Sequence, residues 1–187
     1  MVLSRAGREF MIKAIAQSLP TYAMSVFKFP SSFCDEIHSL ISQFWWGQKN
    51  EERKIHQVAW RKMCRDKRDG GLGFKDMKLF NWALSGKHAW RLVMHPESLL
   101  AQLLKARYFP TSSFMETELG SCPSYTWRGI WEAMWVLRRG MRWRVGDGES
   151  IKVWKDAWIP NTQFHKILSP RGEAIEDLEV SAFIDPV

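Results

Sequence analysis

The sequence lacks any long apolar run. No stretch approaches the ~20 consecutive apolar residues that a membrane-spanning helix needs, and the first residues are too polar for a secretory signal. Cysteine is also scarce: Cys34, Cys64 and Cys122 are dispersed, odd in number and without a CxxC pair. These absences argue against a membrane protein, a disulfide framework and a zinc site. We expect a soluble protein of a reducing compartment that is not secreted.

Clustered carboxylates are missing as well. A two-metal polymerase or nuclease needs acidic side chains grouped around Mg²⁺, yet no two aspartates are adjacent here. Asp35, Asp76 and Asp147 lie at expected helix starts and turns, where acidic residues have ordinary structural roles. The histidines have no visible catalytic partner. The sequence therefore predicts no catalytic residue, no metal site and no cofactor site.

The segment Gly70-Gly71-Leu72-Gly73 is the sharpest turn signal. It lacks the Gly-Lys-Ser/Thr of a phosphate-binding loop and does not follow a predicted strand. Glycine provides positive φ angles and close backbone approach, so we predict a structural turn made by Gly70, Gly71 and Gly73 between two helices.

Tryptophan and positive charge are abundant. Eleven tryptophans imply an aromatic-rich interior, and the net charge is +7. The charge is concentrated: residues 61–110 hold eleven Lys/Arg against four Asp/Glu, whereas residues 159–187 hold two against five. A basic balance favours a polyanionic partner, most commonly nucleic acid.

The basic side chains cluster around the glycine turn and around a second segment near residue 140. Such groups can contact phosphates without reading sequence, although they can equally well only solvate a surface. Around the turn they are Lys54, Arg61, Lys62, Arg65, Lys67, Arg68, Lys75 and Lys78, and in the second segment Arg138, Arg139, Arg142 and Arg144.

Helical periodicity dominates most of the chain. We predict helices over residues 4–19, with Ser4 as N-cap and Pro20 as the stop, and over residues 21–29. A third begins with a capping box of Ser32 and Asp35 and ends at Gly47. Others cover residues 58–64, 74–94, 96–109 and 125–139. The first has an apolar strip of Phe10, Met11, Ala14, Ile15 and Leu19.

The helix that starts near Phe74 has the cleanest pattern. Its predicted core-facing side is Leu79, Trp82, Ala83, Gly86, Trp90 and Val93, and its predicted solvent side is Lys78, Asn81, Ser85, His88 and Arg91. The helix over residues 125–139 shows Trp127, Ile130, Trp131, Met134 and Trp135 at similar spacing.

The period changes to two near residue 142. Trp143 and Val145 alternate with arginines, a Gly-Asp-Gly turn follows, and Ile151 and Val153 alternate with Lys152, which predicts a β-hairpin. The expected fold is therefore mainly α, a bundle of about six to seven helices with one C-terminal β-hairpin. We divide it into residues 1–110 around the glycine turn, residues 111–160, and a weakly ordered tail or truncated start of a further unit over residues 161–187.

Seven ordered blocks of sequence carry a family resemblance. They are LSRAGREFMIKAIAQSLPTYAMSVFKFP, FWWG, KIHQVAWRKMC, DGGLGFKDMKLFNWALSGKHAWRL, SLLAQLLKARYFP, PSYTWRGIW and WRVGDGESIKVWKDAWIP. Together, over roughly residues 3–160, they resemble the part that follows the polymerase palm in plant LINE-type (non-LTR) retrotransposon reverse transcriptases. They are also similar to stand-alone plant fragments labelled as uncharacterised mitochondrial proteins.

The resemblance implies a thumb and connection region that grips the template–primer. It implies that phosphates are contacted by Arg61, Lys62, Lys75 and the Arg142/Arg144 hairpin, which are named above, and by one further residue, Lys13. In that family the catalytic aspartates lie upstream and a zinc region and ribonuclease H domain downstream, so Mg²⁺ would belong to a polymerase domain that this sequence does not contain.

The implied partner is an RNA/DNA duplex or hybrid bound without sequence preference, with the upstream polymerase domain as a further partner and no membrane. Two other readings stay open. One is a protein-interaction module in which tryptophans of the 125–139 helix dock a partner, and the other is a retroelement remnant without activity. The resemblance leaves both nucleus and mitochondrion as compartments.

Overall fold

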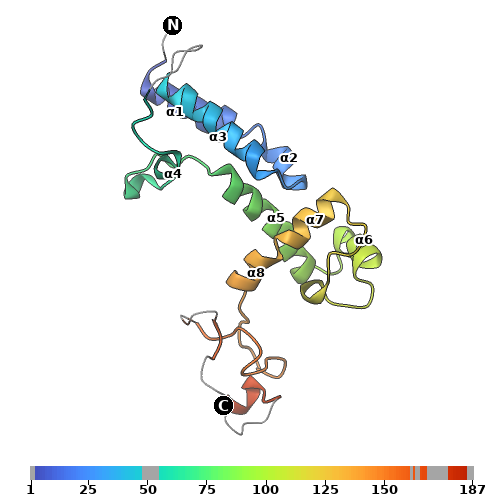
Figure 1. The fold of residues 1–187 in the computed structure, drawn as a ribbon. Helices are drawn as coiled ribbons and strands as arrows, with labels where there is room; N and C mark the ends of the chain where they lie inside the picture. Colours follow the sequence, from blue (N-terminus) through green and yellow to red (C-terminus); the bar gives the residue numbers. More distant parts are fainter. Residues whose placement is uncertain (1–2, 48–54, 161, 163–164, 168–176, 185–187) are drawn as a thin grey trace. The chain divides into compact units, whose positions relative to one another are not determined.

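The computed structural model describes residues 3–47, 55–160, 162, 165–167 and 177–184. By its internal contacts the chain divides into two compact units, Met1–Val136 and Leu137–Val187, and each is described by itself. The predicted mainly helical character is confirmed (Figure 1).

The helices of the described residues cover most of the first unit. They are α1 (Arg5–Met11), α2 (Thr21–Val26), α3 (Ser31–Trp46), α4 (Trp60–Met63), α5 (Met77–Met94), α6 (Leu99–Tyr108), α7 (Tyr125–Glu132) and α8 (Met134–Gly140), of which α8 spans the boundary between the units. A π-helical segment, Ile12–Ala16, continues α1, and short 3-10 turns are formed by Lys67–Asp69, Phe114–Glu116 and Val180–Phe183.

The ends of the helices follow local chemistry. The Ser4 hydroxyl accepts the Gly7 N–H at the start of α1, and Gly47 ends α3 with φ 67°, as the sequence predicted. The predicted capping box of α3 is wrong. That helix begins at Ser31, so Ser32 lies inside it, and the N-cap residue is Pro30, whose side chain has no oxygen to accept a hydrogen bond.

Helix α5 contacts α2, α3, α6 and α7, so it is the centre of the first unit. The predicted faces of the helix are wrong at several positions, although Gly86 is buried and Arg91 is exposed as expected. Asn81 and Ser85, expected in solvent, are buried, whereas Leu79 and Trp90, expected in the core, are 67% and 43% exposed. Small and polar positions lie inside because neighbouring segments approach the helix closely there.

Asn81 shows why a polar residue is buried in α5. Its Oδ1 accepts the Phe29 N–H at 2.6 Å, and its Nδ2 donates to the carbonyl oxygens of Met24 and Phe27 at 2.9 and 3.0 Å. Backbone groups that the end of α2 leaves without helical partners are thus satisfied by one side-chain amide.

Apolar side chains are buried around the glycine turn and around α7 in the described part of the first unit. Around the glycine turn, Ile12, Met24, Cys34, Ile41, Met63, Phe74 and Met77 are buried together. Around α7, Trp127 is fully buried; its ring stacks on Tyr108 with centroids 4.7 Å apart, and Phe109 and Phe114 also pack on it.

The predicted β-hairpin is wrong. No β-strand occurs in the part of the chain that the structure describes, and the segments before and after Gly146–Gly148 do not pair with each other. Instead, a single antiparallel bridge joins Lys152 to Glu179, with Val153 N–H donating to Leu178 O and Val180 N–H to Ile151 O.

Burial explains this outcome. Ile151 and Val153 are buried with Val180, whereas Trp143 and Val145 are exposed. The apolar surface that the second segment needs is supplied from near residue 180, so pairing with residues 143–145 would gain less. Of the predicted tail, residues 161, 163–164, 168–176 and 185–187 lie outside the described residues.

Candidate nucleic-acid interface

The glycine turn is held by backbone hydrogen bonds to the end of α4. The Leu72 N–H donates to Met63 O at 2.9 Å, and the Gly73 N–H donates to Arg65 O at 2.8 Å. Gly70 and Gly73 have φ angles of 75° and 66°, a region that residues with a β-carbon rarely adopt. The chain therefore folds back tightly against residues 63–65.

Gly71 is needed for a different reason, the closeness of its neighbour. A β-carbon built there would lie 2.0 Å from the carbonyl oxygen of Arg65, inside any van der Waals contact. The turn thus fixes the backbone that carries the basic side chains, and it shows none of the strand-to-helix arrangement of a phosphate-binding loop.

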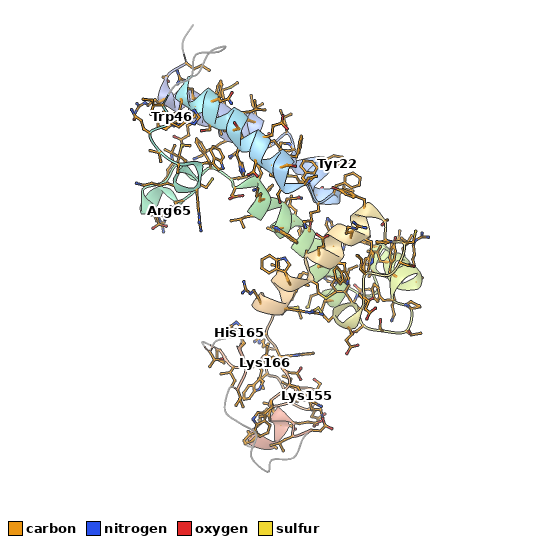
Figure 2. All side chains as sticks on the ribbon, viewed as in Figure 1. Tyr22, Trp46, Arg65, Lys155, His165 and Lys166 are labelled. Atoms are coloured by element: carbon orange, nitrogen blue, oxygen red, sulfur yellow. The ribbon has the colours of Figure 1, made fainter. Side chains whose placement is uncertain are left out.

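Three of the predicted basic residues lie around one open hollow. Arg61 on α4, Arg65 after it and Lys75 before α5 line this hollow together with Cys64, Asp76, Leu79 and Phe80. Gln17, almost fully buried, donates from Nε2 to Lys75 O at 3.4 Å, and the Lys75 ammonium lies 4.5 Å from the centre of the Phe80 ring. Figure 2 labels Arg65, whose side chain is exposed.

Two more candidates meet at a single carboxylate. Lys13 Nζ and Lys67 Nζ lie 2.8 and 2.7 Å from the same carboxylate oxygen, Oε1 of Glu9. The hydrogen bond from Lys13, together with the one from Lys67, holds the pKa of the Glu9 carboxyl below its ordinary value. Glu9 was not among the residues predicted from the sequence, although its position four residues before Lys13 is a helical ion-pair spacing.

The remaining candidates of the first unit are not gathered into one group. Lys78 forms an ion pair with Asp35 at 2.7 Å, which joins α5 to α3. Lys62 and Arg68 are exposed, and Lys54 lies outside the described residues. Arg142 and Arg144 are exposed on the second unit.

His38 contacts residues on both sides of the glycine turn. No structural role for it was predicted from the sequence. Its Nε2 accepts the Met77 N–H at 2.8 Å, its ring stacks on Trp60 at 5.1 Å, and Asp76 Oδ1 lies 3.9 Å away. Asp76 itself caps α5 by accepting the N–H groups of Lys78 and Leu79. Burial lowers the pKa of His38, so the neutral imidazole that accepts this hydrogen bond is favoured.

Three further features concern metal-binding side chains, helix length and the cysteines. Within the described ranges, no group of three or more His, Cys, Asp or Glu side chains is placed to hold a metal ion. In the same ranges no helix has the length and apolarity required to cross a bilayer. The cysteines are unpaired thiols, and burial raises the pKa of Cys64 to about 12.

The structure thus defines a helical protein with an exposed basic turn. Two Arabidopsis thaliana proteins are similar to it in sequence. An "Uncharacterized mitochondrial protein" is 46% identical over 143 residues, which cover 76% of this chain and 93% of that protein. A "Putative ribonuclease H protein" is 33% identical over 169 residues, which cover 84% of this chain.

The chain belongs to the same family as this uncharacterized mitochondrial protein, because the match is strong and spans nearly all of it. It spans only 26% of the length of the second relative. Both relatives are consistent with a plant protein derived from a transposable element. No family model and no solved structure matches the chain.

Proposed function

We propose that this chain is a non-catalytic part of a plant LINE-type reverse transcriptase that holds the RNA/DNA template–primer by its sugar-phosphate backbone. The region after the polymerase palm is the part that the sequence resembles. The longer relative named for ribonuclease H supports an origin in a larger protein of this kind. Polymerisation and RNA cleavage would then belong to other parts of such a protein.

One observation carries the binding function: Arg61, Arg65 and Lys75 line a single open hollow next to the glycine turn. The backbone of Arg65 is held by the close packing of Gly71, and that of Lys75 by the hydrogen bond from Gln17. Cations held on a rigid turn can contact successive phosphates without base contacts, which gives affinity but no sequence preference. The aromatic Phe80 and the carboxylate of Asp76 complete the lining.

The test is a salt titration of binding to an RNA/DNA hybrid and to duplex DNA of mixed sequences. The logarithm of the affinity should fall linearly with the logarithm of salt concentration, and two different sequences should bind alike. Replacing Arg61, Arg65 and Lys75 together by Gln should weaken binding and reduce the slope by about 2 to 3, since each phosphate contact contributes roughly 0.9.

The matched control removes three exposed charges elsewhere on the first unit, by Gln at Lys87, Arg91 and Lys105. An equal loss of slope in both triple variants would show that only net charge matters. Binding of the wild-type chain that ignored salt would count against backbone contact altogether.

A second candidate function, docking to another protein domain, is favoured by the apolar strip of the first helix. The predicted strip does not face the core: Phe10 and Leu19 are 68% and 73% exposed, and Tyr22 on α2 is 84% exposed (Figure 2). Because the chain matches only a quarter of its longer relative, the occupant we favour is the polymerase domain of such a longer protein.

Titration calorimetry with a separately purified polymerase domain of this class tests that candidate. Serine at Phe10 and Leu19 should abolish association, whereas serine at Leu99, which is 80% exposed on α6, should not. Association that survives the double substitution would rule out the strip as the docking surface.

A further inference from the structure

The Glu9 carboxylate holds two ammonium groups that would otherwise repel each other. Lys13 Nζ and Lys67 Nζ both reach Oε1 of Glu9, at 2.8 and 2.7 Å. The two lysines come from the π-helical segment and from the 3-10 turn before the glycines, far apart in the sequence. One anion therefore joins two segments of the proposed binding surface, with an excess of positive charge around it.

The surroundings leave room for an exchange of anions. An open hollow next to the pair is lined by Ala6, Glu9, Phe10, Lys13 and Ala14. The side chain of Lys67 is 64% exposed, so its ammonium can follow a ligand. The side chain of Lys13 is 34% exposed, and its ammonium lies 5.9 Å from the centre of the Phe74 ring. A carboxylate and a phosphodiester each carry one negative charge and two oxygens that can accept hydrogen bonds from ammonium groups.

We propose that the space between Lys13 and Lys67 is a binding position for one phosphate group of a nucleic-acid strand, and that Glu9 is its internal occupant. This inference rests on the proposed function. When a strand binds, its phosphate takes the two ammonium groups and the Glu9 side chain turns toward the open hollow. Glu9 thus competes with the ligand, lowering the affinity of the free chain while keeping the two lysines together.

The test compares Glu9→Gln with a control that changes net charge equally, Glu36→Gln, an exposed position on α3. The probe is a fluorescent RNA/DNA hybrid oligonucleotide, followed by anisotropy at fixed salt. Glu9→Gln should tighten binding roughly three- to fivefold, the size expected for one surface ion pair. Glu36→Gln should have a clearly smaller effect.

The gain should depend on the two lysines. In a chain that already carries Gln at Lys13 and Lys67, Glu9→Gln should change the affinity no more than the control does. If Glu9→Gln binds no tighter than Glu36→Gln while the wild-type chain binds in a salt-dependent manner, the inference is overturned and the proposed function stands. If no variant binds nucleic acid, both fail.

A measurement on the wild-type chain keeps the inference testable if Glu9→Gln does not fold. The carboxyl carbon of Glu9 can be followed by NMR in a glutamate-labelled sample as the oligonucleotide is added. Its shift should move to that of a carboxylate free of ammonium partners. A shift that stays unchanged at saturation would mean that Glu9 is not displaced.

Discussion

Gly71 sets the geometry of the turn through the absence of one carbon atom. Alanine there would place Cβ 2.0 Å from Arg65 O, so the backbone of the turn must move. We expect Gly71→Ala to lower the free energy of unfolding by at least about 1–3 kcal/mol, the usual cost of overpacking. Denaturant titration followed by tryptophan fluorescence measures it.

Gly70→Asn is the matched control for Gly71→Ala. A β-carbon at Gly70 meets nothing within 4 Å, and asparagine tolerates its φ of 75° better than other residues do. This variant should lose less stability. Equal losses in the two variants would mean that the turn is limited by φ and not by the contact with Arg65.

His38 makes the stability of the first unit depend on pH. Burial lowers its pKa in the folded chain, with Asp76 and Asp35 opposing this and Lys78 adding to it. The unfolded chain therefore takes up the proton first. Stability from His38 is complete above the ordinary pKa of 6.5 and is lost as pH falls below it, toward the lowered folded value.

Chemical denaturation at a series of pH values checks this dependence. His38→Gln, which can accept the Met77 N–H at any pH, should flatten the profile between neutral and mildly acidic pH. The comparison is His95→Gln, at a largely exposed side chain that lies 3.2 Å from Glu97, which should change the profile less than His38→Gln does. A wild-type profile that matches the His38→Gln profile would contradict the role given to the imidazole.

At the scale of elements, Asn81 is the residue through which α5 holds the α2–α3 connection. Asn81→Leu keeps the size but removes the partners of Phe29 N–H, Met24 O and Phe27 O. Each buried group left unpaired costs about 1–3 kcal/mol. Urea denaturation should show a large loss, whereas Leu79→Ala should stay within about 0.5 kcal/mol because that side chain is mostly exposed.

Helix α7 carries a core tryptophan and helix α8 an exposed one. Trp127 is fully buried, and its Nε1–H donates to Leu119 O, so Trp127→Ala should cost about 3–5 kcal/mol. Trp135 is 43% exposed and touches Trp82 edge to face at 5.5 Å, so Trp135→Ala should cost much less. Thermal unfolding followed by circular dichroism distinguishes the two, and equal losses would contradict this assignment.

Sequence patterns predicted most of the features that local chemistry decides, the capping box of α3 excepted, and failed where distant segments decide. The Ser4 cap and the Gly47 stop depend on neighbours within one turn, and both are as expected. The faces of α5 and the pairing of Ile151 and Val153 depend on backbone groups near residues 24–29 and 178–180. No periodicity within a segment contains that information.

At the scale of the whole molecule, the basic groups are divided between two units. Arg142 and Arg144 lie on the second unit, and the Arg61, Arg65 and Lys75 hollow lies on the first. If both units contact the same strand, replacing Arg142 and Arg144 by Gln should lower the salt slope by about 2 for a long hybrid.

For a short hybrid that only one unit can contact, the same double substitution should have a smaller effect than for a long one. Anisotropy titrations with hybrids of two lengths measure this difference. An identical loss at both lengths would argue against simultaneous contact by the two units.

Composition alone predicted the concentration of charge around the turn, but not which charges are already engaged. Lys78 is paired with Asp35, and Lys13 and Lys67 with Glu9. The sequence shows Glu9 near Lys13, yet the approach of Lys67 requires the folded turn. Basic residues counted from a sequence therefore overstate the charge that is free to meet a ligand.

The three hydrogen bonds of Asn81 also constrain the order of events during synthesis. The backbone groups of Met24, Phe27 and Phe29 are synthesised more than fifty residues before Asn81, whose side-chain amide is their hydrogen-bond partner in the folded chain. Until α5 has emerged from the ribosome, these backbone groups must be satisfied by water. A truncated product ending before residue 81 should therefore be recognised by chaperones or proteases as unfinished.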